Sequence, residues 1–237
     1  MRKAIILAAG MGSRLQKAHE RPKPLVDING TPSIIRLLNQ FEKNGITETA
    51  ITIGYRGDEI IRHVESEYTG RISITWFENH RYRDPNGVSL LAAKDFVDKR
   101  VMLSMADHVF SNAAVRVIAD LPETGSTSVL MIDRKLDEIF DMDDATKVLV
   151  DDDGRIIGIS KSLTQYNAVD TGLFCISPEL ISALEKLEKP TLSEGVSLLG
   201  AENLMTTVSI GDGWWQDVDT PETLKHAISL ISEKGNE

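Results

Sequence analysis

The sequence predicts an α/β protein built on a single doubly wound, mostly parallel sheet, and three observations support this fold class. Short apolar runs rich in Val and Ile alternate with segments whose apolar residues recur at helical spacing. This alternation is regular over the first 110 residues, which indicates right-handed crossovers between parallel strands. The pattern then loosens and contains an Asp-Gly turn signal. We therefore expect a Rossmann-like N-terminal half and a second half elaborated by a β-hairpin.

The predicted elements can be justified in chain order. Strands are expected at residues 3–9, 49–53, 72–77 and 101–105, with helices at 31–42, 58–67 and 88–96. Thr31 as N-cap and Pro32 in the first turn favour the start of the first helix. The second half is expected to hold helices at 112–119, 180–187 and 192–199, strands at 126–132 and 206–210, and a closing helix at 221–231 capped by Thr220.

A hairpin is predicted where residues 147–150 and 155–159 flank the run Asp151-Asp152-Asp153-Gly154. Three successive carboxylates suggest a metal site. A solvated hairpin tip is the more economical interpretation, because Asp-Gly between alternating apolar residues is itself a strong turn signal.

Length and composition exclude several classes of protein. The 237 residues are 41% hydrophobic, which suits one domain spanning residues 1–237. A formal net charge of −10 argues against a nucleic-acid partner. No apolar run reaches the roughly 18 residues of a membrane span, and Gly10 and Gly12 interrupt the first run too early for a signal peptide. We therefore expect a cytoplasmic protein in which the single cysteine, Cys175, is a buried small hydrophobe.

The loop after the first strand has the features of an anion site. Ligands of such sheets gather at the carboxyl ends of the strands, and two glycines let backbone amides approach an anion closely. Arg14 adds a bidentate fork, and flanking prolines stiffen the chain around Lys23. The stretch differs from a dinucleotide fingerprint, which has a third glycine where Leu15 stands, and from a P-loop, which ends in Gly-Lys-Ser/Thr. Its residues are Leu7, Ala8, Ala9, Gly10, Gly12, Ser13 and Arg14, followed by Lys23.

Acidic residues at two places are candidate metal ligands. Asp107 directly follows the strand expected at 101–105, where a hard cation would lie beside bound phosphates. Asp217 and Asp219 would point to one face of an extended segment and share a cation. Asp219 is also placed to cap the helix that begins at Pro221, so the choice between Asp217 and Asp219 stays open.

A third group of residues could contact a base. Glu78 follows the strand expected at 72–77, and Asn86, Gly87 and Ser89 precede or begin the next helix. A backbone near glycine together with an Asn side chain can recognise a pyrimidine edge. Helix capping is the alternative role for Asn86 and Ser89.

The glycine loop followed by Pro-Lys resembles the signature of the sugar-phosphate nucleotidyltransferase superfamily. The resemblance implies the nucleotide-diphospho-sugar transferase fold, with residues 1–110 mainly binding nucleotide and residues 111–237 mainly binding an acceptor. It also implies that Arg14 and Lys23 stabilise charge on the phosphates and are catalytic, and that Mg²⁺ is held by Asp107 with Asp217 or Asp219.

Six further segments narrow the resemblance. In order they are 86–94, 105–111, 145–148, 169–174, 192–194 and 215–220, and together they resemble the CTP:inositol-1-phosphate cytidylyltransferases. By that resemblance Lys147 and Lys161 bind the acceptor phosphate, and Asp170 and Thr171 bind acceptor hydroxyls. His108 is expected to shape the acceptor pocket, because a phosphate nucleophile is already anionic and needs no general base.

The expected reaction is Mg²⁺-dependent transfer of CMP from CTP to inositol-1-phosphate. Rival activities are phosphocholine or phosphonate cytidylyltransferase and hexose-1-phosphate uridylyl- or thymidylyltransferase. A non-catalytic nucleotide-sugar sensor is a rival of a different class, although it would not need to retain every charged position. The partners expected are small-molecule substrates, and relatives suggest a homodimer and a membrane transferase, fused or separate, acting downstream.

Overall fold

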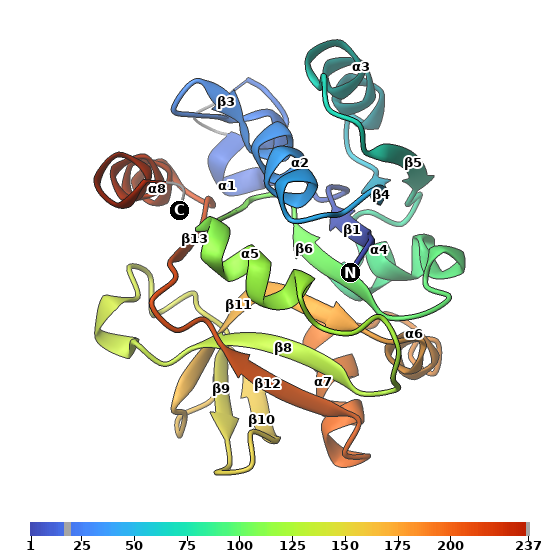
Figure 1. Cartoon of the computed structure of the whole chain (residues 1–237), viewed down its shortest axis with the longest axis vertical. Coiled ribbons are helices and arrows are strands. Elements are labelled where there is room, and N and C mark those ends of the chain that lie inside the picture. The colour runs from blue at the N-terminus through green and yellow to red at the C-terminus, as the bar shows by residue number, and fades with distance from the viewer. Residues whose placement is uncertain (17–19, 236–237) are drawn as a thin grey trace.

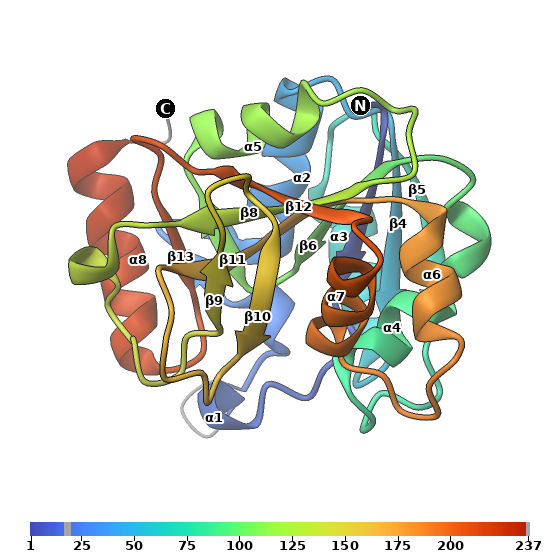
Figure 2. The same ribbon diagram turned by 90° about the horizontal axis from the view of Figure 1, so that it is seen from below.

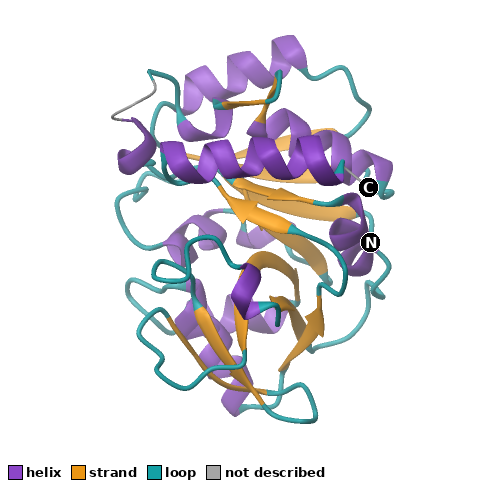
Figure 3. Cartoon of the chain, turned by 90° about the vertical axis from the view of Figure 1, so that its left-hand side faces the viewer, coloured by secondary structure: helices purple, strands orange, loops and turns teal. Residues whose placement is uncertain are grey.

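A nine-stranded mixed sheet runs through the molecule between helices on both faces (Figures 1 and 3). The computed structural model describes residues 1–16 and 20–235, except the side chains of Ser13 and Gln16. The strands of this sheet are β1 (Lys3–Leu7), β4 (Glu48–Ile53), β5 (Ser73–Glu78), β6 (Val101–Met105), β8 (Ser128–Asp133), β9 (Lys147–Val150), β10 (Ile156–Ser160), β11 (Ala168–Ile176) and β12 (Met205–Ser209).

Two short ribbons and eight α-helices complete the described secondary structure, with three 3₁₀ turns. The ribbons pair β2 (Asp27–Ile28) with β3 (Thr31–Pro32) and β7 (His108–Phe110) with β13 (Trp215–Asp217). The helices are α1 (Ser13–Gln16), α2 (Ser33–Lys43), α3 (Gly57–Glu67), α4 (Asn86–Ala92), α5 (Asn112–Ala119), α6 (Pro178–Leu184), α7 (Leu192–Ala201) and α8 (Pro221–Lys234). The 3₁₀ turns are η1 (Lys23–Leu25), η2 (Lys94–Phe96) and η3 (Leu136–Glu138).

The N-terminal half is the doubly wound part. β6, β1, β4 and β5 lie side by side and parallel, with β1 flanked by β6 and β4. Strand order therefore reverses at β1, and the crevice beyond the carboxyl ends of β1 and β6 is the expected ligand position in such a sheet. The Ala106 amide donates to the Leu7 carbonyl (3.0 Å), which keeps the two strand ends together.

The second half is organised by β11, an element that the sequence pattern did not predict. This strand is antiparallel to β6, β8 and β9, so it joins the parallel half to the rest of the sheet. Asp170-Thr171-Gly172 interrupts its apolar run, and a register shift against β8 lies between Asp170 and Phe174. A polar interruption within a strand removes the continuous apolar pattern by which buried strands are identified.

Each face of the sheet has its own apolar core. α2, α3 and α5 pack against one face around Phe41 and Phe110. The other face packs against α4, α6 and α7 around Phe174. Cys175 is fully buried in the first of these cores, where burial raises the pKa of its thiol to about 11, so its predicted role as a small hydrophobe is confirmed.

The β9–β10 hairpin is confirmed, with its tip at Asp151–Gly154. Gly154 has φ 80°, and the Asp151 carboxylate accepts from the amides of Asp153 and Arg155. These local bonds account for one of the three carboxylates as a turn residue. Seen in Figure 2, the hairpin lies between α8 and α7.

Several helix boundaries differ from expectation; for example, the helix expected at 180–187 is α6 (Pro178–Leu184), and the closing helix extends to Lys234. Thr31 is not an N-cap: it pairs with Ile28 in the β2–β3 ribbon, because Asn29 and Gly30 adopt φ of 54° and 82° and form a tight turn. The helix expected at 88–96 instead ends at Ala92 and continues as η2. Thr220 does cap α8, in a capping box with Thr223. None of the helices in residues 1–16 and 20–235 is long and apolar enough to cross a membrane.

Candidate active site

The glycine loop leads from β1 into the short helix α1 at the crevice. Gly12 has φ 59°, a conformation that favours glycine, and a Cβ there would lie 2.8 Å from the Lys23 Cβ. Glycine is therefore required both by the turn and by the close approach of Lys23. Arg14 extends from α1 with a half-exposed side chain. The side chain of Ser13 lies outside the described part of the structure.

Lys23 is the buried cation of the site. Its ammonium group contacts the carboxylates of both Asp107 and Asp219, and its side chain is 9% exposed. Burial alone would lower the pKa of Lys23, but the two carboxylates outweigh it and raise that pKa. Burial likewise opposes ionisation of Asp107, yet Lys23 and His108 hold the pKa of Asp107 well below its usual range. Lys23 and Asp107 are thus both charged at neutral pH.

The β7–β13 ribbon explains how residues 110 positions apart in the chain meet. His108 lies opposite Asp217 in this antiparallel pair, and the Val218 amide donates to the Asp107 carbonyl (2.9 Å). The ribbon therefore places Asp107, from the end of β6, beside the segment that leads into α8.

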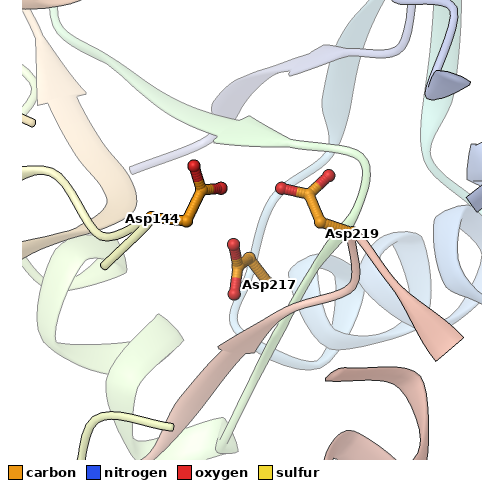
Figure 4. A group of neighbouring side chains, drawn as sticks. All are labelled: Asp144, Asp217 and Asp219. Carbon is orange, nitrogen blue, oxygen red and sulfur yellow. The ribbon is translucent and has the colours of Figure 1, made fainter. Parts of the chain in front are cut away.

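Asp217 and Asp219 point toward a third carboxylate, that of Asp144 (Figure 4). One oxygen from each of the three residues lies within 4.8 Å of the others. Burial raises the pKa of Asp217, an effect that His108 partly offsets. Carboxylate oxygens held this close together are suited to a hard divalent cation, so the donor set fits Mg²⁺.

Asp144 is a residue that the sequence interpretation missed. It lies in the loop between η3 and β9, where its carboxylate accepts from Arg14 Nη2 (3.0 Å) and from Lys161 Nζ (2.7 Å). Arg14 Nη2 also donates to Asp219 (2.8 Å). An ion-pair chain therefore crosses from the glycine loop to the second half. The one feature that could have indicated Asp144 is its position in the sequence, immediately before the segment 145–148.

Two adjoining cavities open at these residues. The smaller, about 260 Å³, lies between the glycine loop and the cations, and its lining includes Gly10, Gly12, Arg14, Lys23, Asp107 and Asp219. The larger, about 360 Å³, extends toward the second half and includes Asn86, Ser89, His108, Asp144, Lys161, Asp170 and Asp217 in its lining. The two share Leu7, Gly10, Asp107 and Asp219, so one extended molecule could occupy both.

Of the four residues expected near a base, two line the larger cavity and two do not. Asn86 and Ser89 line the larger cavity, and neither is the N-cap of α4, which is Pro85. The Asn86 side chain accepts from the Leu192 amide (3.0 Å), while a Cβ on Gly87 would lie 2.5 Å from the Pro190 carbonyl oxygen. Glu78 is exposed at the end of β5, beside His80 (3.3 Å).

The five residues expected near an acceptor fall into two groups. His108, Lys161 and Asp170 line the larger cavity. Burial raises the pKa of Asp170 to about 6. Lys147 and Thr171 are buried and turned to the backbone: the Lys147 amine donates to the Asp143 carbonyl (3.1 Å), and the Thr171 hydroxyl donates to the Met131 carbonyl (2.9 Å). The structure places neither of them in the lining of this cavity.

Comparison with known proteins gives one family match. Residues 4–196 match the family model described as the MobA-like NTP transferase domain. The chain is 30% identical to a bifunctional IPC transferase and DIPP synthase of Rubrobacter xylanophilus, covering 96% of this chain and 51% of that protein. It is 33% identical to the protein of the same description from Archaeoglobus fulgidus, covering 95% and 43%. The chain therefore spans about half the length of these relatives.

Other relatives match along their whole length. A UTP–glucose-1-phosphate uridylyltransferase of Haloferax volcanii is 26% identical, with coverage of 98% of this chain and 97% of that protein. Among solved structures, the inositol-1-phosphate CTP transferase from T. maritima has a TM-score of 0.81 at 25% identity, covering 98% and 97%. A putative glucose-1-phosphate thymidylyltransferase from Bacillus anthracis has a TM-score of 0.83 at 19% identity, covering 98% and 96%, which bears on the fold alone. The predicted α/β fold is confirmed by these likenesses.

Proposed function

We propose that this protein transfers CMP from CTP to inositol-1-phosphate in a Mg²⁺-dependent reaction that releases pyrophosphate. The chain belongs to the family with a MobA-like NTP transferase domain, which is a family of nucleotidyltransferases. The observation that carries the proposal is the buried Lys23, held between Asp107 and Asp219 at the glycine loop. A fixed cation beside two carboxylates is suited to a substrate that combines phosphates with a metal ion.

The phosphate side of the site consists of the glycine loop, Arg14 and Lys23. Arg14 is half exposed and can turn from Asp144 and Asp219 toward a ligand in the smaller cavity. Its planar fork suits two phosphate oxygens, whereas Lys23 supplies a compact charge at a fixed position.

Asp107, Asp217 and Asp219, with Asp144 beside them, are the residues that would hold Mg²⁺. When bound, the ion would neutralise charge on the phosphates. Asp219 contacts both Lys23 and Arg14, so these cations compensate the carboxylate charge before phosphates enter. Arginine and lysine then exchange carboxylate partners for phosphate oxygens.

In the proposed reaction an oxygen of the acceptor phosphate forms a bond to the α-phosphorus of CTP. The bond from that phosphorus to the bridging oxygen breaks, and the electron pair leaves with pyrophosphate toward Arg14 and Lys23. No proton has to be removed from the attacking oxygen, so the contribution of the protein is alignment and charge stabilisation.

The larger cavity supports a polyol phosphate as acceptor. Lys161 provides a cation for the acceptor phosphate, and Asp170 provides oxygens that can accept from hydroxyl groups. Likeness to the inositol-1-phosphate CTP transferase supports the choice of both CTP and inositol. The placement of Asn86 and Ser89 at the same cavity is consistent with contact to the base.

The test is a pyrophosphate-release screen that crosses ATP, CTP, GTP and UTP with inositol-1-phosphate, glucose-1-phosphate, phosphocholine and aminoethylphosphonate. We expect the CTP and inositol-1-phosphate pair to give the highest kcat/KM, with turnover abolished by EDTA and restored by Mg²⁺. A higher kcat/KM for UTP with glucose-1-phosphate would contradict the proposed substrates but would still show that the protein is a nucleotidyltransferase. Absence of turnover for every pair would contradict both.

Lys23→Met is the variant that tests the carrying observation, because it keeps the length of the side chain and removes its charge. We expect kcat to fall by about 10²–10³-fold, the usual cost of losing one electrostatic group at a reacting phosphate or acyl centre. Lys186→Met is a matched control, since Lys186 is exposed and lines neither cavity, and we expect it to retain wild-type turnover.

A further inference from the structure

His108 lies against the proposed metal ligand Asp107 in an arrangement that fixes the orientation of both side chains. Its Nδ1 is 2.7 Å from Asp107 Oδ1, while Asp107 Oδ2 accepts from Lys23. Because a carboxylate at this site only accepts, His108 Nδ1 carries the hydrogen. Neighbouring side chains in a regular strand point to opposite faces, but Asp107 belongs to the turn before β7 and can face His108.

The imidazole of His108 is also held from the sides by two aromatic rings. It stacks on Phe110 and on Trp215, with ring centroids 6.0 Å away in each case and interplanar angles of 26° and 12°. Phe110 is two residues along the same strand, and Trp215 is diagonal to His108 across the β7–β13 ribbon. Trp215 in turn donates from Nε1 to the Asp133 carboxylate (3.2 Å) at the end of β8.

Gly172 of β11 packs against the Nε2 and Cδ2 edge of the imidazole. A Cβ at this position would lie 2.5 Å from His108 Nε2 and 2.6 Å from its Cδ2. Gly172 has φ 75°, and its amide donates to Asp170 Oδ1 (2.7 Å) at the register shift of β11. Phe110, Trp215 and Gly172 therefore restrict the movement of the ring while it keeps its bond to Asp107.

We infer that His108 is a positioning residue that fixes the Asp107 carboxylate for metal and phosphate binding, and that residue 172 is glycine to leave room for the imidazole. Asp133 and Trp215, from the second half of the protein, thereby hold His108, and His108 sets the orientation of Asp107, the proposed metal ligand in the first half. This inference rests on the proposed function for its catalytic consequence, whereas its geometric part concerns packing and can be tested without substrate.

Three substitutions at residue 108 separate the hydrogen bond from the bulk of the ring. His108→Asn keeps an N–H donor near the position of Nδ1, and we expect kcat within about fivefold of wild type. His108→Phe keeps a ring and His108→Leu keeps volume, but neither has a donor. We expect both to lower kcat by 30-fold or more and to raise the Mg²⁺ concentration needed for half-maximal activity. Equal activity of the Asn and Phe variants would overturn the positioning role.

Gly172→Ala tests the space claim, with Gly45→Ala as a matched control. Gly45 also has a positive φ, 85°, but no atom within 4 Å of the Cβ position, so it reports backbone strain alone. We expect Gly172→Ala to lower kcat by 10-fold or more and Gly45→Ala to leave it unchanged. In a His108→Ala background, where both of the contacting ring atoms are absent, Gly172→Ala should change the residual kcat by no more than twofold.

The unfolding midpoint in urea and the binding of Mn²⁺ to the free protein give readouts that do not require turnover. We expect Gly172→Ala to lower the midpoint more than Gly45→Ala does, and His108→Ala to remove that excess. We also expect weaker Mn²⁺ binding by calorimetry in His108→Phe than in His108→Asn. An inactive wild type with these coupled midpoints would refute the proposed function alone. Equal midpoint losses for both glycine variants in both backgrounds would refute the inference.

Discussion

The two halves of the sheet build their shares of the site in different ways. In the first half the glycine loop directly follows β1 and Asp107 directly follows β6, so each group is placed by the end of a parallel strand. In the second half Asp144, Lys161, Asp170 and Asp217 come from separate segments that converge by tertiary contact. Strand ends generate the proposed phosphate side of the site, and loops together with antiparallel strands generate the proposed acceptor side. The first kind of site follows from the fold, whereas the second can vary within it.

The largest expected effect comes from Asp107→Asn, which removes a charge that every substrate would require. We expect turnover to fall by at least about 10²-fold for all acceptors alike, since the lost group acts on the nucleotide phosphates. Initial rates with several acceptors check this. Asp152→Asn, at the exposed hairpin tip, is the control and should retain activity. A loss confined to one acceptor would break the division between the halves.

Lys161→Met should produce an effect of the opposite kind. Lys161 lines the larger cavity and not the smaller one, so we expect the KM for the acceptor to rise by about 10-fold while the KM for CTP changes little. Steady-state kinetics with each substrate varied in turn measure both values. An equal rise in the two KM values would show that Lys161 serves the nucleotide as well.

Asp144→Asn probes the residue that joins the halves. It pairs with Arg14 on one side and Lys161 on the other, both about half exposed, so solvent screening limits its effect to about 3–10-fold. We expect that loss to be shared between the KM values for CTP and acceptor. Asp137→Asn, at an exposed position of η3 before the loop of Asp144, serves as control. An unchanged pair of KM values would exclude Asp144 from substrate binding.

Asp170→Asn is expected to alter the pH dependence of stability. In the folded protein the pKa of Asp170 is raised to about 6 by burial, so ionisation on going from pH 4 to 7 opposes folding. The contribution of Asp170 to the free energy of unfolding should therefore decline over this range. The Asn variant lacks this contribution. Relative to wild type, we expect its free energy of unfolding to gain about 1–2 kcal/mol from pH 4 to 7, once partial exposure is allowed for. Urea unfolding at pH 4, 5, 6 and 7 provides the measurement, and parallel curves for the two proteins would contradict it.

Much of the first half could be predicted from sequence, because its signals are local. The glycine spacing, the Pro-Lys-Pro segment and the carboxylate after an apolar strand each lie within a few residues, and the family match confirms the superfamily that they suggested. Strands 101–105 and 147–150 were predicted to the residue. Thr31 shows the limit of such signals: an N-cap preference was overridden by the Asn29-Gly30 turn.

The missed features depend on contacts between distant segments. β7 and β13 have only three residues each, too few for any periodicity, yet their pairing joins Asp107 to Asp217. Asp144 has no motif of its own, because its loop is shaped by Lys147 bonding to the Asp143 carbonyl and by ion pairs to Arg14 and Lys161. Lys147 shows the same limit: it was expected to bind the acceptor phosphate, but its amine donates to a backbone carbonyl.

The carboxylates of Asp107 and Asp219 are neutralised by side-chain cations: Lys23 contacts both of them, and Arg14 contacts Asp219. In the proposed function, a nucleotide that arrives with a divalent ion supplies new partners both for these carboxylates and for the side-chain cations. The sum of charge held in the crevice then changes less than it would with the nucleotide alone. We expect affinity for the metal–nucleotide complex to depend weakly on ionic strength, whereas a nucleotide without metal leaves the displaced carboxylates uncompensated and binds with a steep salt dependence.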